Sequence, residues 1–294
     1  MTAARPEWLK IKPPDAAAMQ RLKQLLDGMK LNTVCESAQC PNAGECFGSR
    51  TATFMIMGRV CTRSCTFCAV QHGQTERLDA GEPERVAAAA AGLGLRHVVI
   101  TSVTRDDLPD GGAAHFAAVI RAVRRKLPQA SVEVLISDLA GDAAAIGTIA
   151  AAGPDVLSHN IETVPALYQA VRPQADYRRS IHLFRQVRQL APGLVTKSGL
   201  MLGLGETVSG VTAVLQDLRA AGCDMLTLGQ YLRPSAAHIA MTRYITPQEF
   251  DGYRCLALAA GFKAVVASPL VRSSYHAREA YREAVSNLSK TIGG

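Results

Sequence analysis

The chain has 294 residues, of which 48% are hydrophobic and 19% charged, a balance that is typical of globular proteins and excludes a disordered chain. Its formal net charge is +7, but the basic residues are scattered, which argues against a nucleic-acid-binding protein. The chain has no uncharged apolar stretch of about 18 residues and no secretory signal at its start. We therefore expect a cytoplasmic protein that has no membrane partner.

A first helix is expected over residues 15–30, where apolar side chains recur on one face. Short apolar runs typical of strands follow at residues 53–57, 97–101, 132–136, 155–158, 195–202, 225–231 and 262–267. Helical patterns alternate with these runs at residues 82–91, 113–127, 143–152, 178–190, 208–221 and 247–260. The last helix has Thr246 as its N-cap, Pro247 at its first position and Glu249 to complete a capping box.

Alternating strands and helices indicate an α/β fold whose parallel strands are joined by right-handed crossovers. We count six βα units and a seventh short strand over residues 51–267, which predicts a partial (β/α)6 barrel. Residues 1–50 would form a Cys-rich N-terminal extension, and residues 268–294 a helical C-terminal tail. A doubly wound sheet is the alternative, but it usually has a G-x-G-x-x-G turn after its first strand, and none follows residues 53–57.

Six of the eight cysteines fall between Cys35 and Cys68. In a reducing compartment such a cluster indicates metal binding or redox chemistry rather than disulfides. The other two cysteines, Cys223 and Cys255, lie in apolar helical patterns and are expected to be small core residues.

Cys61, Cys65 and Cys68 have the spacing C-x3-C-x2-C directly after the first predicted strand. Offsets of four and seven could form one stripe of a helix, but the neighbouring residues are polar. Zinc is a second alternative, although a structural zinc ion prefers four N or S ligands. An iron–sulfur cubane held by only three thiolates keeps one iron open, and that open position would be the functional one.

Cys35, Cys40 and Cys46 form a second triple with the spacing C-x4-C-x5-C. Pro41 and Gly44 would interrupt any helix between them, so a loop that wraps a metal cluster fits the pattern better. This triple also lacks a fourth thiolate.

The first triple, with Phe67 before its last cysteine, resembles the motif of the radical S-adenosylmethionine (SAM) superfamily. The second triple, together with the sequence R-S-S-Y at residues 272–275, resembles the lipoyl synthase family, and the likeness extends over most of residues 31–278. The resemblance implies two [4Fe-4S] clusters and SAM. SAM would bind the open iron of the first cluster and be cleaved to a 5′-deoxyadenosyl radical. Ser274, or alternatively Ser273, would complete the second cluster.

Residues that contact SAM are expected at the carboxyl ends of the strands, where ligand-binding side chains collect in barrels. The resemblance points to Phe67, Thr104, Asp106, Asn160, Glu162, Gly203 and Glu206. Asp106 could instead pair with Arg105 on a loop, and glycines in a strand often mark only close packing. His159 is expected to be a buried, hydrogen-bonded imidazole rather than a ligand.

For this family the implied reaction is insertion of two sulfur atoms at C6 and C8 of a protein-bound octanoyl-lysine, with the second cluster as sulfur donor. The implied partners are octanoylated lipoyl carrier domains, found in 2-oxoacid dehydrogenase E2 subunits and the glycine cleavage H protein. A low-potential electron donor and a cluster-assembly or carrier protein are implied as well. Alternatives are a biotin synthase-like enzyme and a two-cluster electron carrier, although small ferredoxins carry a fourth cysteine in each run.

Overall fold

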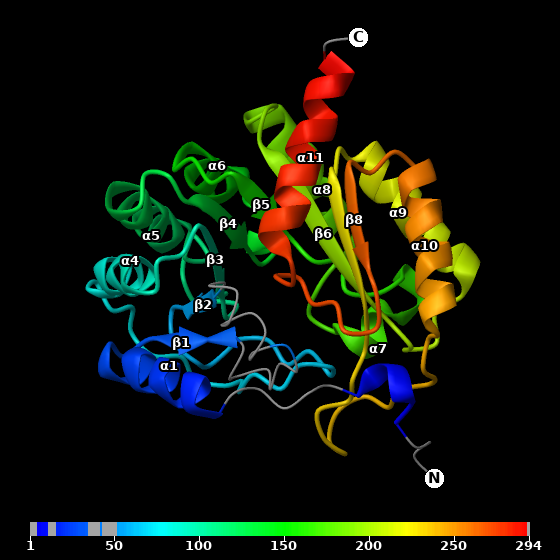
Figure 1. The fold of residues 1–294 in the computed structure, drawn as a ribbon, viewed down its shortest axis with the longest axis horizontal. Coiled ribbons are helices and arrows are strands. Elements are labelled where there is room, and N and C mark those ends of the chain that lie inside the picture. The colour runs from blue at the N-terminus through cyan, green and yellow to red at the C-terminus, as the bar shows by residue number, and fades with distance from the viewer. Residues whose placement is uncertain (1–4, 11–15, 35–41, 43–51, 293–294) are drawn as a thin grey trace.

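The computed structural model describes residues 5–10, 16–34, 42 and 52–292 (Figure 1). One sheet contains β1 (Asn32–Thr33), β2 (Ala52–Ile56), β3 (His97–Ser102), β4 (Ser131–Leu135), β5 (Val156–Ser158), β6 (Val195–Leu202), β7 (Met225–Gln230) and β8 (Ala264–Ala267). The α-helices are α1 (Ala16–Gly28), α4 (Glu82–Gly92), α5 (Ala113–Lys126), α6 (Ala143–Ala151), α7 (Tyr168–Val171), α8 (Tyr177–Leu190), α9 (Val208–Ala220), α10 (Pro247–Ala259) and α11 (Ala277–Ile292). Short 3-10 helices span Glu7–Leu9, Leu139–Gly141 and Pro165–Leu167.

The predicted partial barrel is confirmed. Strands β2 to β8 pair in parallel and in sequence order, and β1 adds an antiparallel edge to β2. Within the described part of the chain, no pairing joins β8 back to β1 or β2, so the sheet stays open. A doubly wound sheet would reverse its strand order at a switch point, and this one does not.

Two elements between the predicted ones were not anticipated. Strand β1 has two residues and helix α7 has four, so neither is long enough to show a periodic pattern. The predicted strand at 262–267 begins two residues later, because Phe262 packs in the apolar layer under α10 instead of pairing in the sheet.

The strands present two different faces because side chains alternate along them. The outward face is apolar and packs under the helices, with Phe54, Ile100 and Val134 beneath the helices α4 to α6 and Leu202 and Leu228 beneath α9 and α10. Figure 1 shows these helices surrounding the curved sheet on its outer side. The inward face is more polar and lines a cavity, as Thr101, Glu133, Gly199 and Thr227 illustrate.

The helix α10 begins as its sequence predicts. Thr246 Oγ1 accepts a hydrogen bond from the Glu249 amide (3.2 Å), and Glu249 Oε2 accepts one from the Thr246 amide (2.9 Å). Cys223 is buried as expected, but the prediction for Cys255 was wrong. Cys255 is exposed, because α10 buries the opposite face that carries Phe250 and Tyr253. None of the described helices is both long and apolar enough to cross a bilayer.

The amino ends of the strands are covered by α11. Its Ala280 and Ala284 pack against the first residues of four strands, Val156, Val195, Met225 and Ala264. The ring of Tyr281 lies 6.3 Å from that of His97, between centroids. Helix α11 therefore closes the end of the barrel opposite the carboxyl ends of the strands (Figure 1).

A buried ion pair lies inside the barrel at this closed end. Lys197 Nζ donates a hydrogen bond of 2.7 Å to Glu133 Oε1, and both side chains are only 1% exposed. His97 Nε2 is 3.4 Å from the other Glu133 oxygen. Burial opposes ionisation of Glu133, but Lys197 and His97 outweigh it, so the pKa of Glu133 lies below its usual value.

We expect Lys197→Met to lower the free energy of unfolding by about 3–5 kcal/mol, because it leaves the Glu133 carboxylate buried without its ammonium partner. Urea unfolding of the apoprotein measures this change. The control Thr246→Ala removes only a helix cap and should cost about 1 kcal/mol. Equal losses for the two variants would contradict a stabilising role of the ion pair.

Candidate functional site

The inner face of the sheet and the loops after its strands enclose a cavity of about 1460 Å³. Cavities that hold one small ligand usually measure about 300–1,000 Å³, so this one has room for a cofactor and a second molecule. Side chains from the strand ends, from the cysteine loop after β2 and from the segment before α11 line it together. The predicted position of the site at the carboxyl ends of parallel strands agrees with this cavity.

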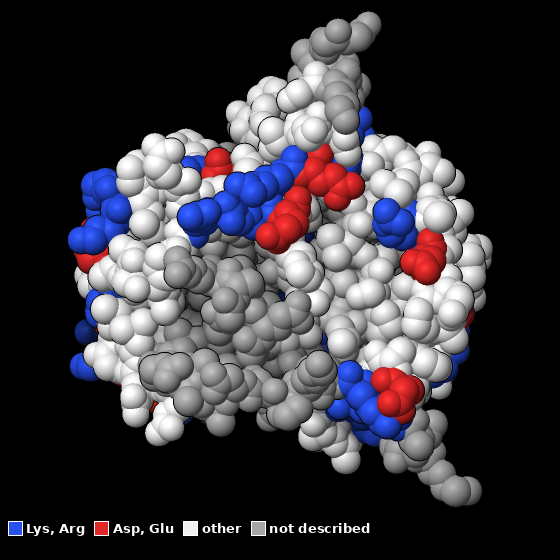
Figure 2. Space-filling view, in the orientation of Figure 1, with Lys and Arg blue, Asp and Glu red and all other residues white. Residues whose placement is uncertain are grey.

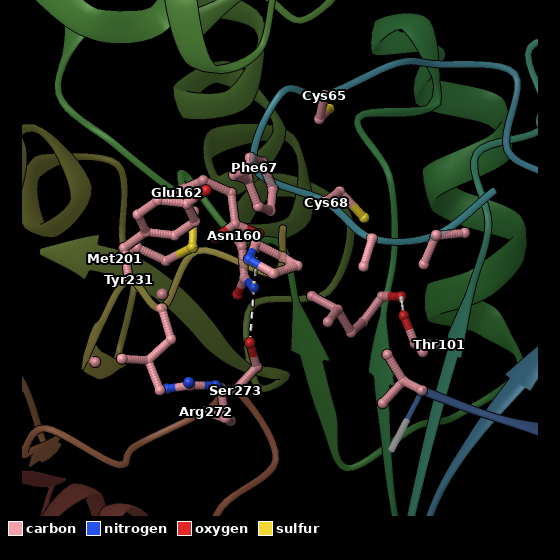
Figure 3. A pocket seen from close by; sticks show the side chains of 18 of the residues that line it. Cys65, Phe67, Cys68, Thr101, Asn160, Glu162, Met201, Tyr231, Arg272 and Ser273 are labelled. Carbon is pink, nitrogen blue, oxygen red and sulfur yellow. Dashed lines mark hydrogen bonds between the residues drawn. The ribbon is translucent and has the colours of Figure 1, made fainter. Parts of the chain in front are cut away.

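Cys61, Cys65 and Cys68 all line the cavity, and each is partly exposed. Backbone hydrogen bonds fix their loop on two sides. The Thr66 amide donates to Val171 O at the end of α7 (3.1 Å), and the Ile239 amide after β7 donates to Thr66 O (3.0 Å). The loop is thus held between two parts of the rim that are more than 60 residues apart in sequence. All three cysteines line the same cavity, and Figure 3 shows Cys65 and Cys68 beside it.

The environment of these thiols suits metal binding. Burial raises the pKa of Cys68 to about 11 and also raises that of Cys65, so a bound cation must displace their protons. Cys61 Sγ accepts hydrogen bonds from the Arg63 amide (3.4 Å) and the Thr104 amide (3.3 Å). In the part of the chain that the structure describes, no three potential ligands converge on one metal ion. Thiolates of a cubane bind different irons and need only a shared space.

Asn160 and Glu162, after β5, form a polar wall beside the cysteine loop (Figure 3). Asn160 Nδ2 donates to Glu162 Oε1 (3.0 Å) and to Ser273 Oγ (2.7 Å), whereas the buried Asn160 Oδ1 has no hydrogen-bond partner. Burial raises the pKa of Glu162, although the guanidinium of Arg172 opposes the shift. An orphaned acceptor beside a carboxylate fits a ligand that brings hydroxyl or ammonium donors.

The backbone near this wall is unusual. Glu162 has φ of 67°, a left-handed conformation that is costly for a residue with a side chain. Its amide donates to Gly199 O (2.9 Å) and its carbonyl accepts from the Met201 amide (2.9 Å), so β6 holds it in place. Strain that is maintained in this way is common at binding sites.

The apolar part of the wall consists of Phe67, Met201 and Tyr231, which belong to one apolar cluster near the cysteine loop (Figure 3). Tyr231 OH donates to Ile239 O (2.9 Å), which orients its ring. Phe67, the residue before the last cysteine, therefore lines the cavity, and its contact with SAM stays a prediction.

Not every predicted contact residue faces the cavity. Thr104 lines it, but Asp106 is turned toward Arg63 and is absent from the lining. Arg105 pairs with Asp107 rather than with Asp106. Gly203 and Glu206 are also absent from the lining: the Glu206 carboxylate accepts hydrogen bonds from the amides of Gly203 (2.6 Å) and Leu204 (2.9 Å) and so fixes the turn after β6. Cys35, Cys40 and Cys46 lie outside the described residues.

Two residues of the cavity, Arg172 and Tyr231, were not predicted from the sequence. Arg172 donates to the carbonyls of Asn160 (2.9 Å) and Ile161 (3.3 Å) from the end of α7, an element too short to predict. Tyr231 directly follows β7, and the strand-end rule applied to Asn160 could have found it as well. His159 is buried and bonded to Ile136 O and Ser180 Oγ, and burial lowers its pKa to about 4, as expected for a neutral structural imidazole.

Comparisons with known proteins show the family of this chain. The model of the radical SAM superfamily matches residues 55–228, more than half of the chain. A lipoyl synthase of Caldanaerobacter subterraneus subsp. tengcongensis is 57% identical over 94% of this chain and 97% of its own length. The chain belongs to the lipoyl synthase family. A second family member, from Rubrobacter xylanophilus, is 56% identical over 95% of this chain and 87% of its own length.

Solved structures support the fold of this family member. The FeFe-hydrogenase maturase HydG from Carboxydothermus hydrogenoformans matches 91% of this chain and 68% of its own with a TM-score of 0.61 at 14% identity. Methylornithine synthase matches 84% of this chain and 77% of its own with a TM-score of 0.52 at 18% identity. At such identities the likeness concerns the fold alone.

We expect Gly199→Ala to weaken SAM binding about tenfold or more. The added Cβ would lie 2.8 Å from Asn160 Oδ1 and from Thr227 Oγ1, so Asn160 would have to shift and its oxygen would lose a hydrogen bond to the ligand. Losing one partner of a buried hydrogen bond costs about 1–3 kcal/mol, where about 1.4 kcal/mol is tenfold in affinity. Equilibrium dialysis of radiolabelled SAM against the iron-loaded protein measures the affinity. Gly147→Ala in α6, whose Cβ would meet only Leu190 Cδ1 at 3.8 Å, should bind as the unmodified protein does. An unchanged affinity of Gly199→Ala for SAM would show that Asn160 does not contact SAM.

Proposed function

We propose that this chain inserts two sulfur atoms, at C6 and C8, into an octanoyl-lysine on a lipoyl carrier domain. The observation that carries the proposal is that one cavity is lined by three cysteines and by the Asn160–Glu162 wall, in a chain of the lipoyl synthase family. The cavity volume of about 1460 Å³ is large enough for SAM and an acyl chain together.

In this proposal Cys61, Cys65 and Cys68 hold a [4Fe-4S] cluster, which with SAM supplies the radical that abstracts hydrogen from an inert C–H bond. The residues themselves bind and orient. Asn160 Oδ1, which lacks a partner, and the Glu162 carboxylate are suited to donors of SAM such as its ribose hydroxyls. Phe67, Met201 and Tyr231 offer an apolar surface that excludes water from the reacting groups.

We assign Cys35, Cys40 and Cys46, with Ser274, to a second [4Fe-4S] cluster that donates the sulfur. Asn42 belongs to the segment between these cysteines, and its Nδ2 donates a hydrogen bond of 2.6 Å to Leu270 O, four residues before Ser274. Ser273 and Ser274 both line the cavity, but the Ser273 hydroxyl already accepts from Asn160. These contacts favour Ser274 as the fourth ligand.

The proposed partners are octanoylated E2 subunits of 2-oxoacid dehydrogenases, the octanoylated glycine cleavage H protein, a low-potential electron donor and a protein that rebuilds the second cluster. On the face shown in Figure 2, basic and acidic side chains lie beside each other near the C-terminal helix instead of forming one basic area. We therefore expect the carrier to be recognised mainly through the acyl-lysine that enters the cavity, with the net charge of +7 favouring an acidic carrier only weakly.

The iron-loaded protein, incubated without oxygen with SAM, a strong reductant and an octanoylated carrier peptide, is expected to add two sulfurs to the peptide through a one-sulfur intermediate. Mass spectrometry of the peptide detects both species. A Cys65→Ala control should neither cleave SAM nor add sulfur. Cleavage of SAM without sulfur transfer would indicate another radical SAM activity, and iron uptake without SAM cleavage would indicate an electron carrier.

The two serines of the tail are expected to behave differently. Ser274→Ala should reduce sulfur transfer at least about tenfold while SAM cleavage continues, because only the second cluster loses a ligand. Ser273→Ala, which removes the hydrogen bond to Asn160, should retain most of the sulfur transfer. Iron content and product per chain measure both effects. The opposite ranking would assign the ligand to Ser273.

A further inference from the structure

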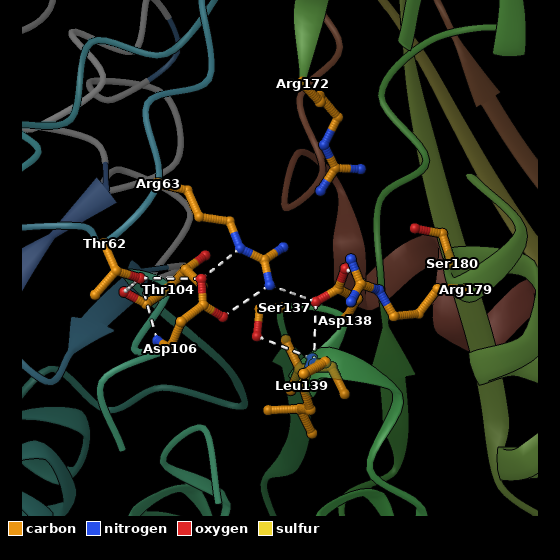
Figure 4. A network of polar contacts seen from close by, with 12 residues as sticks. Thr62, Arg63, Thr104, Asp106, Ser137, Asp138, Leu139, Arg172, Arg179 and Ser180 are labelled. Atoms are coloured by element: carbon orange, nitrogen blue, oxygen red, sulfur yellow. Dashed lines mark hydrogen bonds and ion pairs between the residues drawn. The ribbon is translucent and has the colours of Figure 1, made fainter. Parts of the chain in front are cut away.

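The cysteine loop carries an arginine at the edge of the cavity whose guanidinium is bonded to two carboxylates. Arg63 lies between Cys61 and Cys65, and its side chain is 5% exposed. Its Nε and Nη2 donate to the two oxygens of Asp106 (2.7 and 2.8 Å), and Nη2 also donates to Asp138 Oδ1 (2.7 Å) (Figure 4). One guanidinium thus joins the cysteine loop to the loops that follow β3 and β4.

The second carboxylate is itself held firmly. Asp138 is fully buried, its Oδ1 also accepts from the Ala140 amide (3.2 Å), and Arg179 Nε of α8 lies 3.0 Å from its Oδ2 as an ion pair. Two guanidinium groups and two carboxylates therefore cancel in charge. A network of ion-paired groups whose charges cancel fixes geometry without adding net charge beside the cavity.

This network fixes the hydrogen-bond donors that contact the sulfur of Cys61. That atom accepts hydrogen bonds from the amides of Arg63 and Thr104, at 3.4 and 3.3 Å. The Thr62 amide in turn donates to Thr104 O (3.0 Å), which ties the two donor segments together. Arg63 bonds Asp106, two residues after Thr104, so its side chain joins the same two segments a second time.

We propose that Arg63, clamped by Asp106 and Asp138, is a positioning residue that keeps two N–H donors on Cys61 Sγ and thereby raises the reduction potential of the cluster bound by this loop. Hydrogen bonds to a ligand sulfur withdraw electron density from the cluster and stabilise its reduced form. The inference rests on the proposed assignment of Cys61, Cys65 and Cys68 as cluster ligands.

The decisive variant is Asp106→Ala, measured by redox titration of the iron-loaded enzyme with an electron paramagnetic resonance readout. Removing a negative charge would by itself make reduction easier. Loss of the contact between Asp106 and Arg63 should make reduction of the cluster harder. We therefore expect the equilibrium constant for one-electron reduction to fall about tenfold, which lowers the reduction potential by about 59 mV. Asp106 is 41% exposed, so the variant should fold. Arg63→Lys, which keeps the charge but not the planar fork, should shift the potential in the same direction.

Arg124→Gln is the matched control, because Arg124 also forms a partly buried ion pair, with Asp155 (2.6 Å), that does not involve the cysteine loop. Its potential should equal that of the unmodified enzyme. A raised or unchanged potential in Asp106→Ala, or an equal shift in Arg124→Gln, would overturn the proposal. If replacing Cys61, Cys65 or Cys68 leaves the cluster signal of the enzyme unchanged, these residues are not its ligands. That result would refute the cluster assignment and the proposed role of Arg63 together.

Discussion

Parallel pairing of β2 to β8 is the constraint on which the site depends. When all strands run in one direction, the loops after them meet at one rim, and residues far apart in sequence become neighbours there. This explains why the cysteine loop after β2 faces Asn160 after β5 and Tyr231 after β7. The described strands do not close into a ring, and at the rim Asn42 donates a side-chain hydrogen bond to the carbonyl of Leu270.

The sequence predicted the repeating features of the fold well, because apolar periodicity reports which face of an element is buried. All seven strands and six of the crossover helices lie within two residues of their predicted ends. The elements that were missed, β1 and α7, are too short to be periodic. Cys255 was misplaced for a related reason: an apolar helical pattern locates a stripe, but it does not assign every apolar residue to that stripe.

The site was predicted unevenly. Cysteine spacing predicted the loop after β2 that lines the cavity, because its three cysteines are local in sequence. The partners of polar side chains depend on tertiary contacts, so no pattern could show that Asp106 turns to Arg63 or that Glu206 holds the Gly203 turn. In both cases the carboxylate of a residue expected to touch a ligand forms hydrogen bonds within the protein, and its contact with a ligand stays a prediction. The charged groups around the rim and inside the barrel are therefore largely paired with one another, as with Lys197 and Glu133, which is what burial requires of them.

Because α11 closes one end of the barrel, it limits the routes by which molecules can enter and leave the cavity. Because Ala280, Ala284 and Tyr281 pack over the amino ends of the strands, SAM and the acyl arm of the proposed reaction would both enter the cavity from the carboxyl ends of the strands. A carrier protein docked at this opening would block the exit of molecules that had bound in the cavity before it. Small molecules would then have to enter first and leave last, so that each turnover would follow a fixed sequence of arrivals and departures.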